Sequence, residues 1–87
     1  MYKYNEAILS EMMDESCVLY NTVSNTTHIL NATAKYIWEN CTMMTIDDMV
    51  DSIIDKLNEP IERKVVYGDV AEIIARFLEN NIIQDAE

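Results

Sequence analysis

The stretch THILNATAKYIWENC, residues 27–41, changes from a strand-like to a helix-like pattern at a single residue, and this change decides the fold. Residues 27–30 are typical of a short strand. Asn31 is a favourable helix N-cap, because its side-chain oxygen can accept a hydrogen bond from a free backbone N–H of the first turn. Apolar side chains then recur at helical spacing, at Ala34, Ile37, Trp38 and Cys41. We therefore predict a strand over 27–30 and a helix from Asn31 to about Asn40.

Two more strands are predicted upstream of this stretch, over residues 8–12 and 16–21, where β-forming side chains gather. Asp14 and its neighbour Glu15 suit the turn between them, and Ser24-Asn25 suits the turn that leads back into the third strand. The second and third strands therefore form a predicted hairpin. The few residues at each end of the chain are expected to be loose.

Two more helices are predicted downstream. Thr45 is positioned to cap the first of them, and Pro60 cannot continue it. We predict that the last helix runs from Pro60 to Asn80, because its apolar stripe stays in phase across Gly68. An interior glycine costs only about 1 kcal/mol relative to alanine. The alternative is a break at Gly68 with a restart capped by Asp69.

The predicted order is three strands followed by three helices, which places the chain in the α+β class. A helix pair beside a three-stranded antiparallel sheet is typical of a winged helix-turn-helix. The 87 residues are expected to form a single domain, residues 1–87, with a core over about residues 8–84 that ends in a short apolar tail at Ile82-Ile83. No apolar stretch approaches the roughly 18 residues of a spanning helix, and no signal peptide is evident. We therefore expect the cytoplasm, with Cys17 and Cys41 reduced.

The charge of the chain narrows the choice of partner. There are 16 acidic and 6 basic side chains, for a net charge of −10. Binding to nucleic acid is disfavoured, because each phosphate contact needs a lysine or an arginine. An anionic membrane surface is disfavoured for the same reason. A protein or peptide partner is the expectation that remains.

A DNA-binding regulator is the alternative function, because winged helix-turn-helix folds commonly read DNA with a recognition helix. The predicted last helix carries three basic residues, Arg63, Lys64 and Arg76. The same helix carries four acidic residues, Glu62, Asp69, Glu72 and Glu79. Such a helix is a poor reader of a polyanion.

No catalytic residue, metal site or cofactor is predicted. His28 is the only histidine, so any serine or cysteine nucleophile would have to share it as base, and a structural role fits it better. A zinc site made of His28, Cys17 and Cys41 lacks the close ligand pairs of such sites. Carboxylates recur every four residues on one helix face, at Asp47, Asp51 and Asp55. Without a glycine-containing calcium loop, this face is interpreted as solvated.

The run LNATAKYIWE, residues 30–39, resembles the LN-x-TA-x-x-IW signature of the PqqD family, and the resemblance extends over roughly residues 8–84. Members of this family are small peptide chaperones of pyrroloquinoline quinone biosynthesis and related peptide-modifying pathways. The resemblance implies a winged-helix recognition element that binds the leader of a ribosomally synthesised precursor peptide. It also implies a partner enzyme that receives the peptide, such as a radical SAM enzyme, a leader peptidase or a cyclase. The protein itself would be a non-catalytic adaptor.

The resemblance also implies a binding site, in which the leader adds as an antiparallel strand to the third strand and lies against the last helix. The strand edge would be Thr27, His28, Ile29 and Leu30. The helix wall would be Val66, Val70, Ile73, Ile74 and Phe77. Polar contacts at the rim would come from Arg63, Lys64, Tyr67 and Arg76. Structural roles are implied for Asn31 and Asp69 as helix caps and for Trp38 as a core anchor.

Two points stay open on the residues alone. Spacing does not separate the helix residues that face a peptide from those that face the core. An exposed edge strand could also pair two copies of the chain into a homodimer. Where the family usually has glycine after the last helix, this chain has Asn81, which tolerates the same left-handed backbone.

Overall fold

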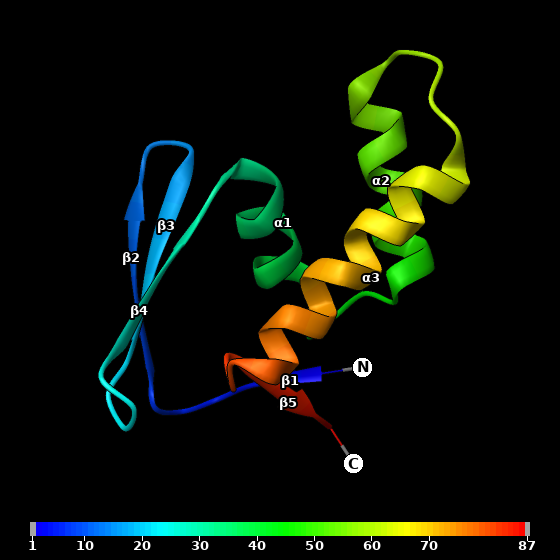
Figure 1. Cartoon of the computed structure of the whole chain (residues 1–87). Coiled ribbons are helices and arrows are strands. Elements are labelled where there is room, and N and C mark those ends of the chain that lie inside the picture. The colour runs from blue at the N-terminus through cyan, green and yellow to red at the C-terminus, as the bar shows by residue number, and fades with distance from the viewer. Residues whose placement is uncertain (1, 87) are drawn as a thin grey trace.

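Eight strands and helices follow one another in the computed structural model, which describes residues 2–86 (Figure 1). They are β1 (Tyr2–Tyr4), β2 (Ile8–Met13), β3 (Ser16–Asn21), β4 (Thr26–Leu30), α1 (Ala32–Asn40), α2 (Ile46–Leu57), α3 (Arg63–Glu79) and β5 (Ile83–Asp85). The predicted α+β class is confirmed, with a three-stranded antiparallel sheet followed by three helices. None of the described helices is long and apolar enough to cross a membrane.

Strands β2, β3 and β4 form the larger sheet in that order, with β3 in the middle. Both predicted turns are confirmed by residues with positive φ, Asp14 (26°) and Asn25 (58°). In the register, Cys17 lies opposite Leu30, and both side chains are buried on the face that meets the helices. On its other side, β4 pairs with no strand among the described residues. The sheet therefore leaves one edge of β4 open.

The prediction of loose chain ends is wrong for the residues that the structure describes. Strand β1 pairs with β5 in an antiparallel two-stranded sheet, with Tyr2 opposite Asp85 and Tyr4 opposite Ile83. The physical reason is burial, because Ile83 enters the core. The prediction of a short apolar tail that folds back is confirmed, since Ile82 is buried as well.

Side-chain caps begin the first two helices as predicted. Asn31 Oδ1 accepts a hydrogen bond from the N–H of Ala34 at 2.9 Å. Thr45 Oγ1 accepts one from the N–H of Asp48 at 3.1 Å. Each cap satisfies a backbone donor that has no partner inside its helix. The caps fix where α1 starts after β4 and where α2 starts after the following loop.

Helix α3 differs from its prediction at one end. It begins at Arg63 rather than Pro60, because α2 ends at a left-handed Asn58 and the chain needs several extended residues before it turns back. The continuous helix across Gly68 is confirmed. Asp69 lies inside α3 and is exposed, so its prediction as a cap is wrong. Asn81 has a φ of 56°, which confirms the left-handed residue after the helix.

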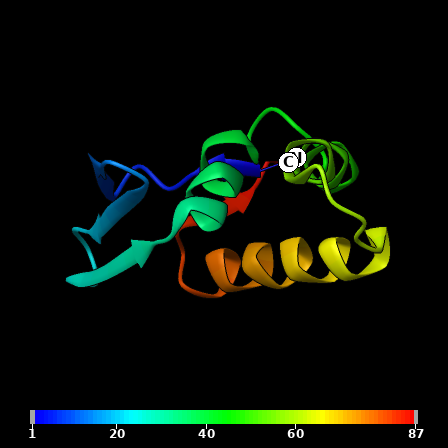
Figure 2. The same ribbon diagram turned by 90° about the horizontal axis from the view of Figure 1, so that it is seen from above.

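The core lies where α1 packs on β3 and β4 and against α3, and it continues between α3 and α2 and toward β5. Its buried side chains include Leu19, Ile37, Trp38, Met49, Val50, Val70 and Phe77. The Tyr36 hydroxyl donates to Ser52 Oγ at 2.7 Å and so links α1 to α2. Arg63 links α3 to α2 through Asp47 at 2.8 Å and Asp51 at 3.0 Å. These contacts fix α3 relative to the rest of the fold, and in Figure 2 α3 and β4 lie along the same side of the molecule.

Candidate functional site

A cavity of about 480 Å³ lies between the open edge of β4 and the C-terminal half of α3. We call it the β4–α3 groove. It is lined by Thr27, His28, Ile29, Leu30, Asn31, Ala34, Ile73, Arg76, Phe77, Asn80 and Ile82. One wall is therefore a strand edge, the opposite wall is a helix, and the start of α1 closes the space between them.

The whole of the predicted strand edge and part of the predicted helix wall meet here. All four predicted residues of β4, residues 27–30, line the groove. From α3, Ile73, Phe77 and Arg76 line it. Among the apolar residues that line the groove, Ile29 is the most exposed, at 76% of its full accessibility. Ile29 therefore exposes apolar surface directly beside the open strand edge.

Three predicted wall residues, Val66, Val70 and Ile74, do not line the groove. Their side chains are buried in the core instead. These residues recur every four positions and form the stripe of α3 that faces the body of the protein. Ile73 is half-buried and lies next to this stripe, on the side that faces β4. The rotation of α3 about its axis therefore places Val70 in the core and Ile73 in the groove, a distinction that spacing alone does not make.

Three predicted rim residues also lie elsewhere. Arg63 is held by two carboxylates of α2. The hydrogen bonds from Arg63 to Asp47 and Asp51 raise the pKa of the Arg63 guanidinium above its usual value. Tyr67 lines a separate cavity of about 410 Å³ together with Tyr2. Lys64 is exposed near the start of α3 and lines neither cavity.

Sequence reasoning missed four lining residues, Asn31, Ala34, Asn80 and Ile82. Asn31 and Asn80 were interpreted only as residues that begin or end helices. A signal was nevertheless present, because a residue directly after the edge strand and one at the end of the wall helix must both lie near the space between them. For Ala34 and Ile82, the only signal in the sequence was that their side chains are apolar.

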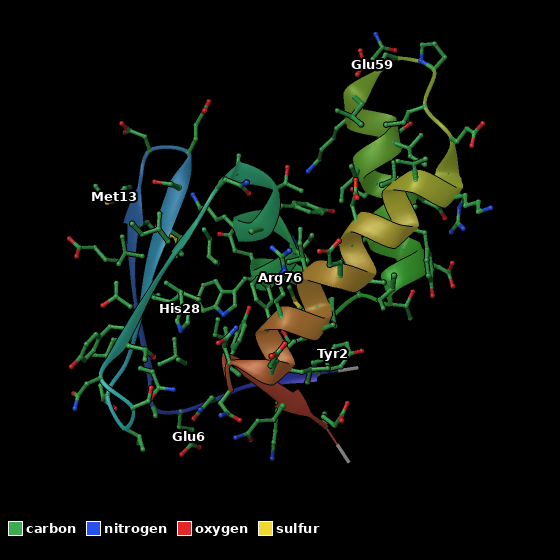
Figure 3. The ribbon with its side chains drawn as sticks, viewed as in Figure 1. Tyr2, Glu6, Met13, His28, Glu59 and Arg76 are labelled. Atoms are coloured by element: carbon green, nitrogen blue, oxygen red, sulfur yellow. The ribbon has the colours of Figure 1, made fainter. Side chains whose placement is uncertain are left out.

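His28 places an unpartnered polar atom at the groove. Its ring is partly buried, and its Nε2 atom is shielded from solvent without a hydrogen-bond partner among the described residues. A buried polar atom in this state costs about 1–3 kcal/mol. Figure 3 places His28 on β4 and Arg76 on α3, on the two sides of the groove. A ligand in the groove therefore meets an imidazole on one side and a guanidinium on the other.

The lining of the groove supplies apolar side chains, amides, an imidazole and a guanidinium. Its lining side chains contain no cysteine and no carboxylate that could work with His28 as a nucleophile or a second base. Within residues 2–86, no cluster of histidine, cysteine and acidic side chains has metal-binding geometry. The two cysteines are unpaired and buried away from the groove. An open strand edge beside an apolar helix wall is instead the arrangement that accepts an extended peptide strand.

The fold and the groove together define a small α+β protein with a three-stranded antiparallel sheet, three helices and an open sheet edge. The family model described as "Coenzyme PQQ synthesis protein D (PqqD)" matches residues 16–83. The chain therefore belongs to the PqqD family, and the resemblance seen in residues 30–39 is confirmed. No curated protein matches the sequence.

Two solved structures share the fold over nearly the whole chain. One is described as "TbiB1 in Complex with the TbiA(beta) Leader Peptide"; it has a TM-score of 0.84 and 20% identity, and the match covers 98% of both chains. The other is described as "Lasso peptide synthetase B1 complexed with the leader peptide"; it has a TM-score of 0.84 and 20% identity, and the match covers 97% of this chain and 98% of that one. The likeness at this identity is one of fold.

Proposed function

We propose that this protein is a non-catalytic adaptor that binds the leader of a ribosomally synthesised precursor peptide in the β4–α3 groove and presents it to a modifying enzyme. The observation that carries the proposal is the open edge of β4, which faces a cavity instead of solvent or another strand. Membership of the PqqD family supports it. The two structures of the same fold support it as well, because both were solved with a leader peptide.

The binding mode follows from the geometry of a sheet. A leader strand added antiparallel to β4 would lie about 4.8 Å from it and would pair with its free N–H and C=O groups. Alternate side chains of the added strand would point toward α3. Ile73 and Phe77 offer them an apolar surface, with Leu30 and Ile82 beneath. Backbone pairing would supply affinity for any extended chain, and the apolar wall would supply selectivity.

The proposal includes a protein partner and a cellular location. The partner is an enzyme that modifies the peptide, of the radical SAM, leader peptidase or cyclase type. One of the similar structures is itself described as "Lasso peptide synthetase B1", which supports a partner in peptide modification. The location is the cytoplasm, where two free, buried cysteines stay reduced.

The DNA-binding alternative gains no support from the structure. Two of the three basic side chains on α3 are already paired with carboxylates. Arg63 pairs with Asp47 and Asp51, and Arg76 pairs with Glu72. Helix α3 carries as many acidic as basic residues, so it has no net positive charge for phosphate groups.

The test is a titration of the ¹⁵N-labelled protein with the leader of a short precursor peptide, sought among the genes next to its own. We expect saturable amide shifts in residues 27–30 and around Ile73 and Phe77. The Tyr36–Ser52 contact between α1 and α2 lies outside the groove and serves as the internal control. Shifts that leave the groove residues unchanged would rule out this site.

A second experiment tests strand addition itself. Leader peptides that are N-methylated at one residue each lose one backbone donor. We expect weaker binding at every second position of the bound segment, because alternate N–H groups of an edge strand point toward its partner. A loss of affinity without this period of two would mean that the leader binds in another conformation.

A further inference from the structure

The β4–α3 groove contains one positively charged side chain, Arg76. The other basic side chains whose contacts are seen lie elsewhere. Lys56 lies over the Tyr36 ring at 4.1 Å, Lys35 Nζ donates to the backbone oxygen of Asp14 at 3.4 Å, and Arg63 is bound to α2. In a protein with a net charge of −10, a single guanidinium in the candidate site is a local exception.

Arg76 is held only loosely. It makes one ion pair, from Nη2 to Glu72 Oε1 at 2.7 Å, and both side chains are largely exposed, at 68% and 61%. Ion pairs between exposed side chains contribute little, so a better partner can replace this one. A guanidinium has five N–H donors in a planar fork and can hold a second carboxylate through two parallel hydrogen bonds. Arg63, by contrast, already binds two carboxylates.

The position of Arg76 on α3 says where such a carboxylate would be. Arg76 directly precedes Phe77 and follows Ile73 by three residues, so its side chain flanks the apolar wall. The other charges on this side of α3 are acidic, with Asp69 and Glu72 before Arg76 and Glu79 after it. Each of them would repel a peptide carboxylate placed beside it. An acidic side chain is therefore favourable only beside Arg76.

From this arrangement we infer that Arg76 selects precursor leaders with an acidic residue on the same strand face as the apolar anchor, two residues away from it. Side chains on one face of a strand repeat every second residue, at a spacing of about 6.6 Å. Glu72 acts as the resident competitor, which the leader carboxylate displaces. The inference rests on the proposed function and names the substrate class for the same groove.

The test measures leader binding by isothermal titration calorimetry, with the same leader and with variants of it. In those variants, each Asp or Glu of the bound segment is changed to Asn or Gln. We expect Arg76→Gln to weaken binding about fivefold, the effect of losing one partly exposed charge pair. Glu72→Gln should strengthen binding, because it removes the competitor. One of these leader variants should bind the wild-type protein as weakly as the unchanged leader binds the Arg76→Gln protein. Arg76→Gln should not weaken the binding of that variant any further.

Lys64→Gln is the matched control, because it removes the same charge from the same helix at an exposed residue outside the groove. It should leave the dissociation constant unchanged. A leader with its acidic residue changed to lysine should bind Arg76→Glu better than it binds the wild type.

The outcomes separate the two proposals. If the leader binds and Arg76→Gln changes nothing, or if the bound segment has no acidic residue, this inference is wrong and the adaptor function stands. If the wild type does not bind the leader, both fall.

Discussion

The hydroxyl of Tyr4 donates a hydrogen bond of 2.7 Å to the backbone carbonyl of Trp38, and the centroids of the two rings lie 4.8 Å apart. This contact joins strand β1 to helix α1 across 34 positions of sequence. Trp38 is part of the core. Tyr4 therefore anchors β1, and through it β5, to the helices.

Replacing Tyr4 by phenylalanine removes the hydrogen bond but keeps the ring. We expect the free energy of unfolding to fall by about 0.5–1.5 kcal/mol, the net contribution of one such bond. Tyr4→Ala should cost more, because it also removes the aromatic contact. Urea unfolding followed by circular dichroism measures both. Equal stabilities for Tyr4→Phe and the wild type would mean that the hydroxyl is no better paired in the fold than in water.

Two aspartate substitutions on α3, Val70→Asp and Ile73→Asp, should have different effects, one on stability and the other on leader binding. Val70 is 1% exposed, so Val70→Asp buries an unpaired carboxylate and should unfold the protein, since that cost is several kcal/mol. Ile73 lines the β4–α3 groove, and Ile73→Asp should leave a folded protein that binds leader at least tenfold more weakly, about 1.4 kcal/mol. Circular dichroism and calorimetric titration distinguish the two effects. A folded Ile73→Asp variant with unchanged affinity would remove Ile73 from the binding site.

Replacing Gly68 by alanine should stabilise the protein. It lies in the interior of α3, its φ is not positive, and a Cβ built there meets no heavy atom within 4 Å. Gly68→Ala should therefore raise the free energy of unfolding by about 0.5–1 kcal/mol, because alanine restricts the unfolded chain more. The urea midpoint measures this gain. A lower midpoint with an unchanged m-value would show that this part of α3 needs the freedom of glycine.

Cys41 makes stability depend on alkaline pH. Burial raises the pKa of its thiol from the ordinary 9.0 to about 11. Between these two values the unfolded chain has lost the proton that the folded chain keeps, so the folded state becomes less stable as pH rises from about 9 to about 11. Burial also raises the pKa values of Cys17 and Tyr4, which act in the same direction. Below this window the effect is absent.

The check on Cys41 compares urea unfolding of the wild type and Cys41→Ala at several pH values. The variant should lose less stability than the wild type between pH 9 and 11, and the difference between the two proteins should be constant from pH 6 to 8. Parallel curves over the whole range would mean that the Cys41 thiolate is as well accommodated in the fold as outside it.

Local signals explain what the sequence could predict of the fold. The caps at Asn31 and Thr45 and the turns at Asp14 and Asn25 are each decided within a few residues, and all four were predictable. The pairing of β1 with β5 was not, because it joins three-residue strands from opposite ends of the chain. Strands this short carry no alternation of their own, and only burial in the folded protein stabilises them.

The candidate site was predictable in part, for a related reason. The strand edge follows from the position of the third strand, and residues 27–30 all line the groove. The helix wall depends on the rotation of α3, which is fixed by the burial of Val66, Val70 and Ile74 in the core. Val70 and Ile73 are both apolar, so their side chains gave no sign that one enters the core and the other the groove.

Because β1 and β5 are paired neighbours, the polypeptide enters and leaves this fold at one place. Partners such as Tyr2 and Asp85 in an antiparallel pair lie about 5 Å apart between Cα atoms. Both strands lie away from the β4 edge (Figures 1 and 2). The fold can therefore be inserted into a surface loop of a larger enzyme without separating its two ends. We expect a circular permutant joined across this pair and opened at the exposed turn around Val23 to keep the same topology.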